Sequence, residues 1–190
     1  MREGGVARAG RNLEASPAQE RLARLIARYR PGFALDQAFY NDPEIYRCDL
    51  ERFLFRHWLC VGHASRIPDP GDYFLFDVAE ESVIIVRREN GSIGALANVC
   101  RHRGSRVRYE AAGHAKVFVC PYHGWGYNLD GSLRAARHMP EGFERSAYGL
   151  KSIHLRLAEG LIFVNLSDAP IGFEAAAAYA DQVAGPYGWA

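Results

Sequence analysis

The chain is 190 residues long, with 48% hydrophobic and 24% charged residues, a balance typical of globular proteins and not of disordered ones. Its 23 Lys and Arg against 22 Asp and Glu give a net charge of +1, which argues against a broadly basic nucleic-acid-binding protein. Four cysteines are too few for a disulfide scaffold, and no apolar run approaches the roughly 20 residues of a membrane helix. The N-terminal sequence also lacks the apolar segment of a secretory signal, so we expect a cytoplasmic protein with no membrane or nucleic-acid partner.

Two helices are predicted in the N-terminal part of the chain. The Ser-Pro pair at residues 16–17 is followed by apolar residues at three- and four-residue spacing, which predicts an amphipathic helix to about Tyr29. Asp42 before Pro43 is typical of a helix N-cap and first turn, and predicts a second helix to about His57.

Short strands are predicted from residue 73 onward. Turn pairs such as Asn90-Gly91, Asp130-Gly131 and Glu159-Gly160 separate several of them. The expected strands cover residues 73–78, 82–88, 92–99, 115–120, 125–128, 132–135, 151–158 and 161–166. Many short strands with regular turns predict a mainly β fold, an antiparallel sandwich preceded by short helices. An Ala-rich stretch over residues 173–180 predicts a final helix.

Two short motifs each combine one cysteine with one histidine. The first is Cys100-Arg101-His102-Arg103-Gly104 and the second is Cys120-Pro121-Tyr122-His123-Gly124-Trp125. Thiolate and imidazole ligands suit either a tetrahedral zinc or a two-iron cluster. Zinc motifs usually place two like ligands on one element, whereas each motif here supplies one ligand of each kind. This mixture suits a 2Fe-2S cluster with both cysteines on one iron and both histidines on the other, although a structural zinc module stays open. We predict Cys100, His102, Cys120 and His123 as the ligands.

The paired motif resembles the Rieske family, and the likeness includes the glycine after each half, Pro121 and Trp125. Around the ligands we expect a contribution from Arg103, Gly104, Tyr122, Gly124 and Trp125. The two glycines are expected to let backbone N–H groups approach the bridging sulfides. Tyr122 and Trp125 are expected either to shield the cluster from water or to serve as ordinary core aromatics.

Charge counting predicts how such a cluster behaves. Two ferric ions, two sulfides and two thiolates sum to zero, so reduction produces a charge of only −1. Rieske potentials accordingly lie at roughly −150 to +300 mV, against about −400 mV for plant-type ferredoxins. Cytochrome bc-type Rieske proteins carry an extra disulfide and a hydroxyl residue near the cluster, where this chain has Ser105, Tyr122 and Trp125. We therefore predict a potential at the low end of the range.

A longer stretch is similar to the α subunits of Rieske non-haem iron oxygenases, from about Gly32 to Ser167. The similarity includes Asn98-Val99 before the first motif, and Tyr40, Phe55-Arg56-His57-Trp58 and Pro70-Gly71-Asp72 upstream. The upstream part is similar to the branch that demethylates quaternary amines such as glycine betaine or stachydrine. The resemblance implies a reductase or ferredoxin donor, and contact with a catalytic domain or with other α subunits in a trimer.

In that family a mononuclear iron, held by two histidines and one carboxylate, lies in a following catalytic domain. Only His138 and His154 follow the second motif, and neither belongs to a closely spaced histidine pair with a carboxylate. We therefore expect this chain to transfer electrons without activating oxygen, as a fragment or a separately encoded half. The expected division is a tail and helix over 1–45, a Rieske domain over 46–168 and the start of a missing domain over 169–190. A free-standing Rieske ferredoxin is the alternative.

Four arginines lie in the first motif and just after it. Arg101, Arg103, Arg106 and Arg108 form either a positive rim that favours the reduced cluster and steers an acidic donor, or a plain solvated loop. Outside the motifs, Cys48 is expected to be a helix thiol and not a ligand, and Cys60 a buried, inert one.

Overall fold

The computed structural model describes residues 17–137 and 139–189. Two compact units make up the chain, Met1–Phe53 and Leu54–Ala190. The predicted ligands all lie in the second unit, so the first is described only briefly.

The described part of the first unit consists of short helices: α1 (Pro17–Ala27), α2 (Ala38–Asn41) and α3 (Pro43–Asp49). Asp42 caps α3 as predicted, because its carboxylate accepts a hydrogen bond from the Glu44 N–H at 2.9 Å. Its other carboxylate oxygen pairs with Arg21 of α1 at 2.7 Å. The second predicted helix was too long: α3 ends at Asp49, and a single π-helical turn, Leu50–Leu54, follows. The predicted cap residue Ser16 lies outside the described residues.

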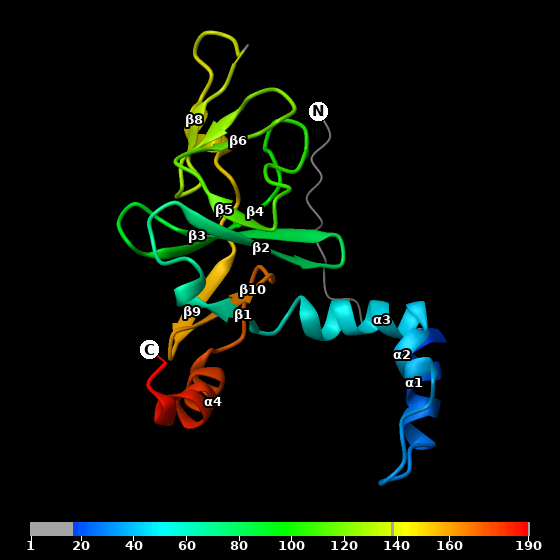
Figure 1. Cartoon of the computed structure of the whole chain (residues 1–190). Helices are drawn as coiled ribbons and strands as arrows, with labels where there is room; N and C mark the ends of the chain where they lie inside the picture. Colours follow the sequence, from blue (N-terminus) through cyan, green and yellow to red (C-terminus); the bar gives the residue numbers. More distant parts are fainter. Residues whose placement is uncertain (1–16, 138, 190) are drawn as a thin grey trace. The chain divides into compact units, whose positions relative to one another are not determined.

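The second unit is built from three antiparallel sheets (Figure 1). The central sheet has the order β4-β3-β2-β5, and the two smaller sheets have the orders β1-β10-β9 and β6-β7-β8. The strands are β1 (Leu59–His63), β2 (Asp72–Val78), β3 (Glu81–Arg87), β4 (Ile93–Ala97), β5 (Ala112–His114), β6 (Phe118–Val119), β7 (Gly126–Tyr127), β8 (Leu133–Ala135), β9 (His154–Ala158) and β10 (Leu161–Asn165). The predicted antiparallel fold with many short strands is therefore confirmed.

Two strands, β1 and β5, were not predicted from the sequence. In β5 the residues are small or polar and all three are exposed, so no alternating pattern marks the strand. In β1 the register shifts between Cys60 and Gly62, which breaks the alternation that would reveal it. The final helix was predicted in the right place, and α4 runs over Glu174–Ala184. In the described part of the chain no helix is long and apolar enough to cross a membrane.

Strand β3 of the central sheet is buried on both faces, and this positions the predicted ligand loops. On one face of β3, Val83 and Ile85 pack in a core with Ile162 and Val164 of β10. On the other face, Ile84 and Val86 belong to a core that contains both predicted ligand cysteines. Full burial of one such aliphatic side chain contributes roughly 1.5 to 3 kcal/mol. The small β6-β7-β8 sheet thus rests on a rigid layer rather than on a mobile surface loop.

Candidate metal centre

The first ligand loop, residues 100–105, is a tight turn closed by its own backbone. Cys100 donates its N–H to the Ser105 carbonyl at 2.8 Å and accepts from the Gly104 N–H at 2.9 Å. Gly104 has a φ of +74°, which side chains rarely adopt. A bridge between Val99 and Arg106 closes the base of the loop. The loop therefore holds the Cys100 side chain at a fixed place above the core.

The second ligand loop, residues 120–125, repeats this backbone pattern. Cys120 donates to the Trp125 carbonyl at 2.8 Å and accepts from the Gly124 N–H at 3.0 Å. Gly124 has a φ of +70°, and the pair Val119 and Gly126 closes the base. The two cysteines therefore occupy equivalent positions, while the histidine follows two residues later in the first loop and three residues later in the second.

The predicted ligand side chains form two neighbouring pairs, one of cysteines and one of histidines. Cys100 and Cys120 are each 2% exposed. Burial raises the pKa of the Cys120 thiol, the backbone N–H of Tyr122 lowers it, and the neighbouring Cys100 thiol raises it. The rings of His102 and His123 lie edge to face, with their centroids 4.6 Å apart. The two loops thus supply a pair of buried sulfur atoms and a pair of imidazoles in contact with each other.

The residues present fit a two-iron cluster. The Nδ1 atom of His102 is buried and has no hydrogen-bond partner among the described residues, a costly state that a bond to a metal removes. In the described chain, no group of three or more His, Cys, Asp or Glu side chains is arranged to hold a single ion. A Rieske cluster needs only two protein ligands on each iron. One cysteine and one histidine from each loop are the donor types that such a cluster uses.

The two aromatic residues of the second motif lie in different surroundings. Trp125 is 1% exposed and stacks on the His102 ring, with centroids 4.9 Å apart and planes 9° apart. Tyr122 is 58% exposed and lies against His123, with centroids 3.8 Å apart. Trp125 therefore backs one histidine from inside the core, while Tyr122 covers part of the other at the surface.

The two motif glycines, Gly104 and Gly124, are needed for their backbone conformation. A Cβ atom added to Gly104 would meet no described atom within 4 Å, and at Gly124 the nearest is 3.9 Å away. Among the described residues, their positive φ rather than close contact calls for glycine. Their predicted approach to the sulfides stays a prediction.

Tyr127 is a site residue that the sequence analysis missed. Its hydroxyl oxygen lies 3.2 Å from Cys100 Sγ and 3.0 Å from the Arg101 N–H, which can only donate to it. The hydroxyl proton is therefore free to point at the sulfur. Burial, followed by the bond to Cys100, raises the pKa of Tyr127 well above its usual range. The sequence did contain a signal for Tyr127. It follows Trp125 by two residues in a predicted strand, so both side chains point to the same face.

This hydroxyl bears on the predicted potential. The prediction of a low value rested on Trp125, which offers no hydroxyl near the cluster. Tyr127 offers one to a ligand sulfur instead, and a hydrogen bond to a ligand sulfur favours the reduced state. The expected potential is still below that of bc-type proteins, because Trp125 supplies no second hydroxyl.

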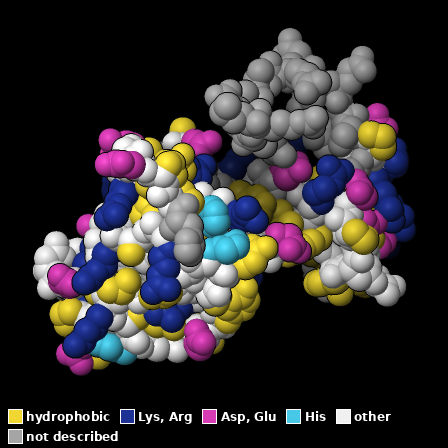
Figure 2. Space-filling model, turned by 90° about the horizontal axis from the view of Figure 1, so that it is seen from above, with side chains coloured by type: hydrophobic (Ala, Val, Ile, Leu, Met, Phe, Trp, Pro, Cys, Tyr) yellow, Lys and Arg dark blue, Asp and Glu magenta, His cyan; other side chains and the backbone are white. Residues whose placement is uncertain are grey.

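The four arginines of the first motif do not form one group. Arg101 and Arg103 are exposed, Arg106 pairs with Asp77 at 3.4 Å, and Arg108 is partly buried. Figure 2 looks onto the molecule from above the view of Figure 1 and shows histidine side chains reaching the surface beside Lys or Arg. If a positive rim exists, Arg101 and Arg103 are therefore its exposed members, and the choice between a rim and a plain solvated loop stays a prediction.

The two bystander cysteines lie away from both ligand loops in the sequence. Cys48 lies in α3 as expected, and its side chain is buried. Cys60 is exposed, so its predicted burial was wrong. It lies next to the irregular register of β1, where the alternation of inward and outward side chains is interrupted.

Comparison with known proteins identifies what these loops are similar to. The model of the family described as "Rieske [2Fe-2S] domain" matches residues 57–154, which include both loops. The glycine betaine monooxygenase oxygenase subunit of Chromohalobacter salexigens is 37% identical over 171 residues, covering 90% of this chain and 38% of that protein. The benzene 1,2-dioxygenase subunit alpha of Pseudomonas putida is 36% identical over 143 residues, covering 74% of this chain and 32% of that protein. The chain thus spans well under half the length of these relatives.

Solved structures show the same fold. The apo form of a quaternary ammonium Rieske monooxygenase gives a TM-score of 0.70 at 29% identity, covering 78% of this chain and 44% of that one. Naphthalene 1,2-dioxygenase from a Rhodococcus species, bound to indole, gives a TM-score of 0.75 at 31% identity, covering 86% of this chain and 39% of that one. Both agree with the predicted fold class.

Proposed function

The chain belongs to the Rieske [2Fe-2S] domain family, and we propose that Cys100, His102, Cys120 and His123 hold its cluster and that the chain transfers single electrons. The observation that carries this proposal is the pair of matching loops, each of which holds one buried cysteine, and whose two histidine rings lie edge to face. The partnerless Nδ1 atom of His102 supports the assignment from an independent direction.

When bound, the cluster supplies a one-electron couple between a neutral and a singly negative state. The chain's own residues determine how readily that charge is accepted. Tyr127 donates a hydrogen bond to Cys100 Sγ, and backbone N–H groups of the second loop point at Cys120 Sγ. Trp125 and the surrounding core exclude water from the sulfur side of the site, whereas the histidine side lies nearer the surface.

We further propose that the chain corresponds to the N-terminal part of an oxygenase α subunit. The matched relatives are named as oxygenase subunits, and the similarity to one of them covers 90% of this chain, including the N-terminal helices. In this proposal residues 1–45 form a tail and helix, 46–168 the Rieske domain, and 169–190 the beginning of a catalytic domain with a mononuclear Fe(II). Its partners are a cytoplasmic reductase or ferredoxin and neighbouring α subunits.

The substrate class follows from the relatives and is also a proposal. The glycine betaine relative matches more of this chain than the benzene dioxygenase relative does, 90% against 74%. This favours oxidative demethylation of a quaternary amine over hydroxylation of an aromatic ring. A free-standing electron carrier has less support, because such a carrier has no use for the helices that precede the sheets.

Metal and sulfide analysis of the purified chain tests the cluster assignment. We expect two irons and two acid-labile sulfides per chain, together with a rhombic EPR signal that appears on reduction by dithionite. A colourless protein that contains one zinc per chain would refute the assignment.

A further inference from the structure

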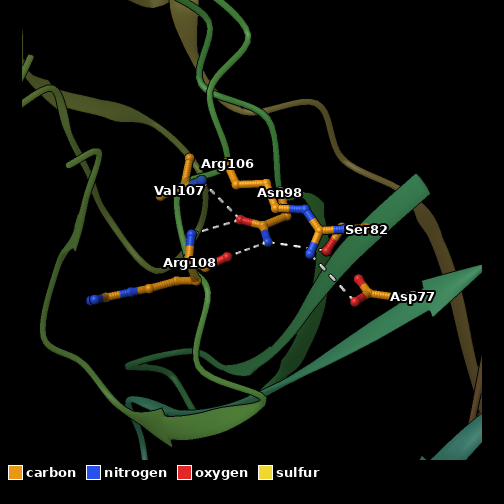
Figure 3. Close-up of polar contacts among 6 residues, drawn as sticks. All are labelled: Asp77, Ser82, Asn98, Arg106, Val107 and Arg108. Atoms are coloured by element: carbon orange, nitrogen blue, oxygen red, sulfur yellow. Dashed lines mark hydrogen bonds and ion pairs between the residues drawn. The ribbon is translucent and has the colours of Figure 1, made fainter. Parts of the chain in front are cut away.

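Asn98 lies two residues before the first proposed ligand, and both ends of its side-chain amide are hydrogen-bonded (Figure 3). Its side chain is fully buried. The amide oxygen accepts from the N–H groups of Val107 and Arg108 at 3.1 and 2.8 Å. The amide nitrogen donates to Ser82 Oγ at 3.1 Å and to the Arg108 carbonyl at 2.8 Å. Asn98 therefore uses its full hydrogen-bonding capacity to fix the segment that returns from the first loop onto β3.

Asn98 holds the main chain of Arg108, and the Arg108 side chain then reaches the segment that leads into the second loop. Its Nη2 atom donates to the Val117 carbonyl at 3.1 Å. Its guanidinium lies over the Phe118 ring, 5.4 Å from the centroid, and over the Tyr73 ring, 5.5 Å from the centroid. Phe118 begins β6, which leads directly into Cys120. One residue thus connects the segment after the first loop to the strand that enters the second.

The charge of Arg108 has no acidic partner among the described residues. Among the described residues its Nε atom is buried without a hydrogen-bond partner, and its side chain donates one hydrogen bond, to a neutral carbonyl. Arg106, two residues earlier, differs because its guanidinium pairs with Asp77 at 3.4 Å near the surface (Figure 3). A partly buried cation without a counter-charge is costly, and a nearby negative charge offsets that cost.

We propose that Arg108 is a positioning residue of the electron-transfer site. Its side chain connects the segment after the first loop to the strand that enters the second, and its unpaired positive charge raises the reduction potential of the site. The inference rests on the proposed ligand set. Reduction gives the site its one negative charge, and Arg108 provides a fixed positive charge against the core that contains both ligand cysteines. Arg106 cannot act in the same way because Asp77 already neutralises it.

The test compares Arg108→Gln with Arg106→Gln in redox titrations of the full chain, followed by EPR. Gln retains side-chain N–H donors but removes the charge. For R108Q we expect the equilibrium constant for reduction to fall about tenfold, which is 59 mV for a one-electron couple. For R106Q we expect a change of less than about twofold, because the lost charge is exposed and already paired.

A purely structural role would lower the stability of R108Q without changing its potential, so an unchanged potential overturns the proposal. An equal decrease in R106Q also overturns it. If R108Q does not retain its cluster, Arg108→Lys decides, because Lys preserves the charge. A reduction potential of R108K equal to that of the wild-type chain supports the proposal, and a lower reduction potential of R108K contradicts it. A wild-type chain without a Rieske EPR signal refutes the proposed function itself, which separates the two failures.

Discussion

The first ligand loop and the second close with the same two backbone hydrogen bonds, yet their sulfur atoms have different neighbours. Cys100 receives a side-chain hydroxyl, from Tyr127, whereas the N–H groups directed at Cys120 belong to the backbone of its own loop. The segment after the first loop is also anchored by Asn98, for which the second loop has no counterpart among the described residues. In the proposed site the repeated backbone therefore places the ligands, and we expect the unmatched side chains to adjust how readily the site accepts an electron.

If both loops contribute equally to ligand placement, removing either sulfur has the same large effect. We expect Cys100→Ser and Cys120→Ser each to abolish the cluster, because one iron would lose half of its protein ligands. Iron content and the EPR signal measure this loss. Cys60→Ser is the matched control, since Cys60 is exposed and lies outside both loops. A C120S chain that retains a normal cluster would show that the loops are not equivalent.

The glycines test the equivalence of the two backbones. Gly104→Ala and Gly124→Ala each place a side chain at a positive φ, which is +74° at residue 104 and +70° at residue 124. We expect each to lower the free energy of unfolding by about 1 to 2 kcal/mol. Urea unfolding measures the loss, and Gly126→Ala is the control, because its φ is not positive and its Cβ would meet only ordinary contacts, the nearest at 3.6 Å. Unequal losses at residues 104 and 124 would contradict the symmetry.

Tyr127 tests the difference between the loops. Tyr127→Phe removes one hydroxyl and keeps the ring in its buried place, so we expect the potential to fall by an amount equivalent to about 1 kcal/mol. A redox titration measures the shift. Tyr148→Phe is the control, because the structure records no hydroxyl bond from that residue to either sulfur. An unchanged potential in Y127F would mean that the bond to Cys100 has no effect on reduction.

The smallest expected effect concerns a carboxylate in the turn after the second loop. The Ser132 hydroxyl, followed by its backbone N–H, lowers the pKa of Asp130 below its ordinary value. Because the folded pKa is depressed, this stabilisation is complete above the unfolded pKa of about 3.9 and is lost as the pH falls through the folded value. Asp130 is exposed, so we expect Asp130→Asn to cost only a few tenths of a kcal/mol at pH 7. The cost should disappear in unfolding experiments at strongly acidic pH, and a cost that is independent of pH would rule out the carboxylate as its source.

Much of the site could be predicted because its signal is local in the sequence. The Cys and His spacing, the glycines and the turn pairs each act over a few residues, so they predicted the loops and most strands. The contacts of Tyr127 and Arg108 could not be predicted, because they join residues brought together only when the sheets pack. The exposed Cys60 was missed for a related reason: the register of β1 depends on its pairing with β10.

The most direct test of the account is pulsed EPR of the reduced wild-type chain. The proposed ligand set predicts hyperfine coupling to two imidazole nitrogens, one from His102 and one from His123. His123→Cys should reduce this to one nitrogen and lower the potential, because a thiolate adds negative charge to the cluster. A reduced cluster without nitrogen coupling, or with the same two couplings in H123C, would contradict the ligand assignment on which the account depends.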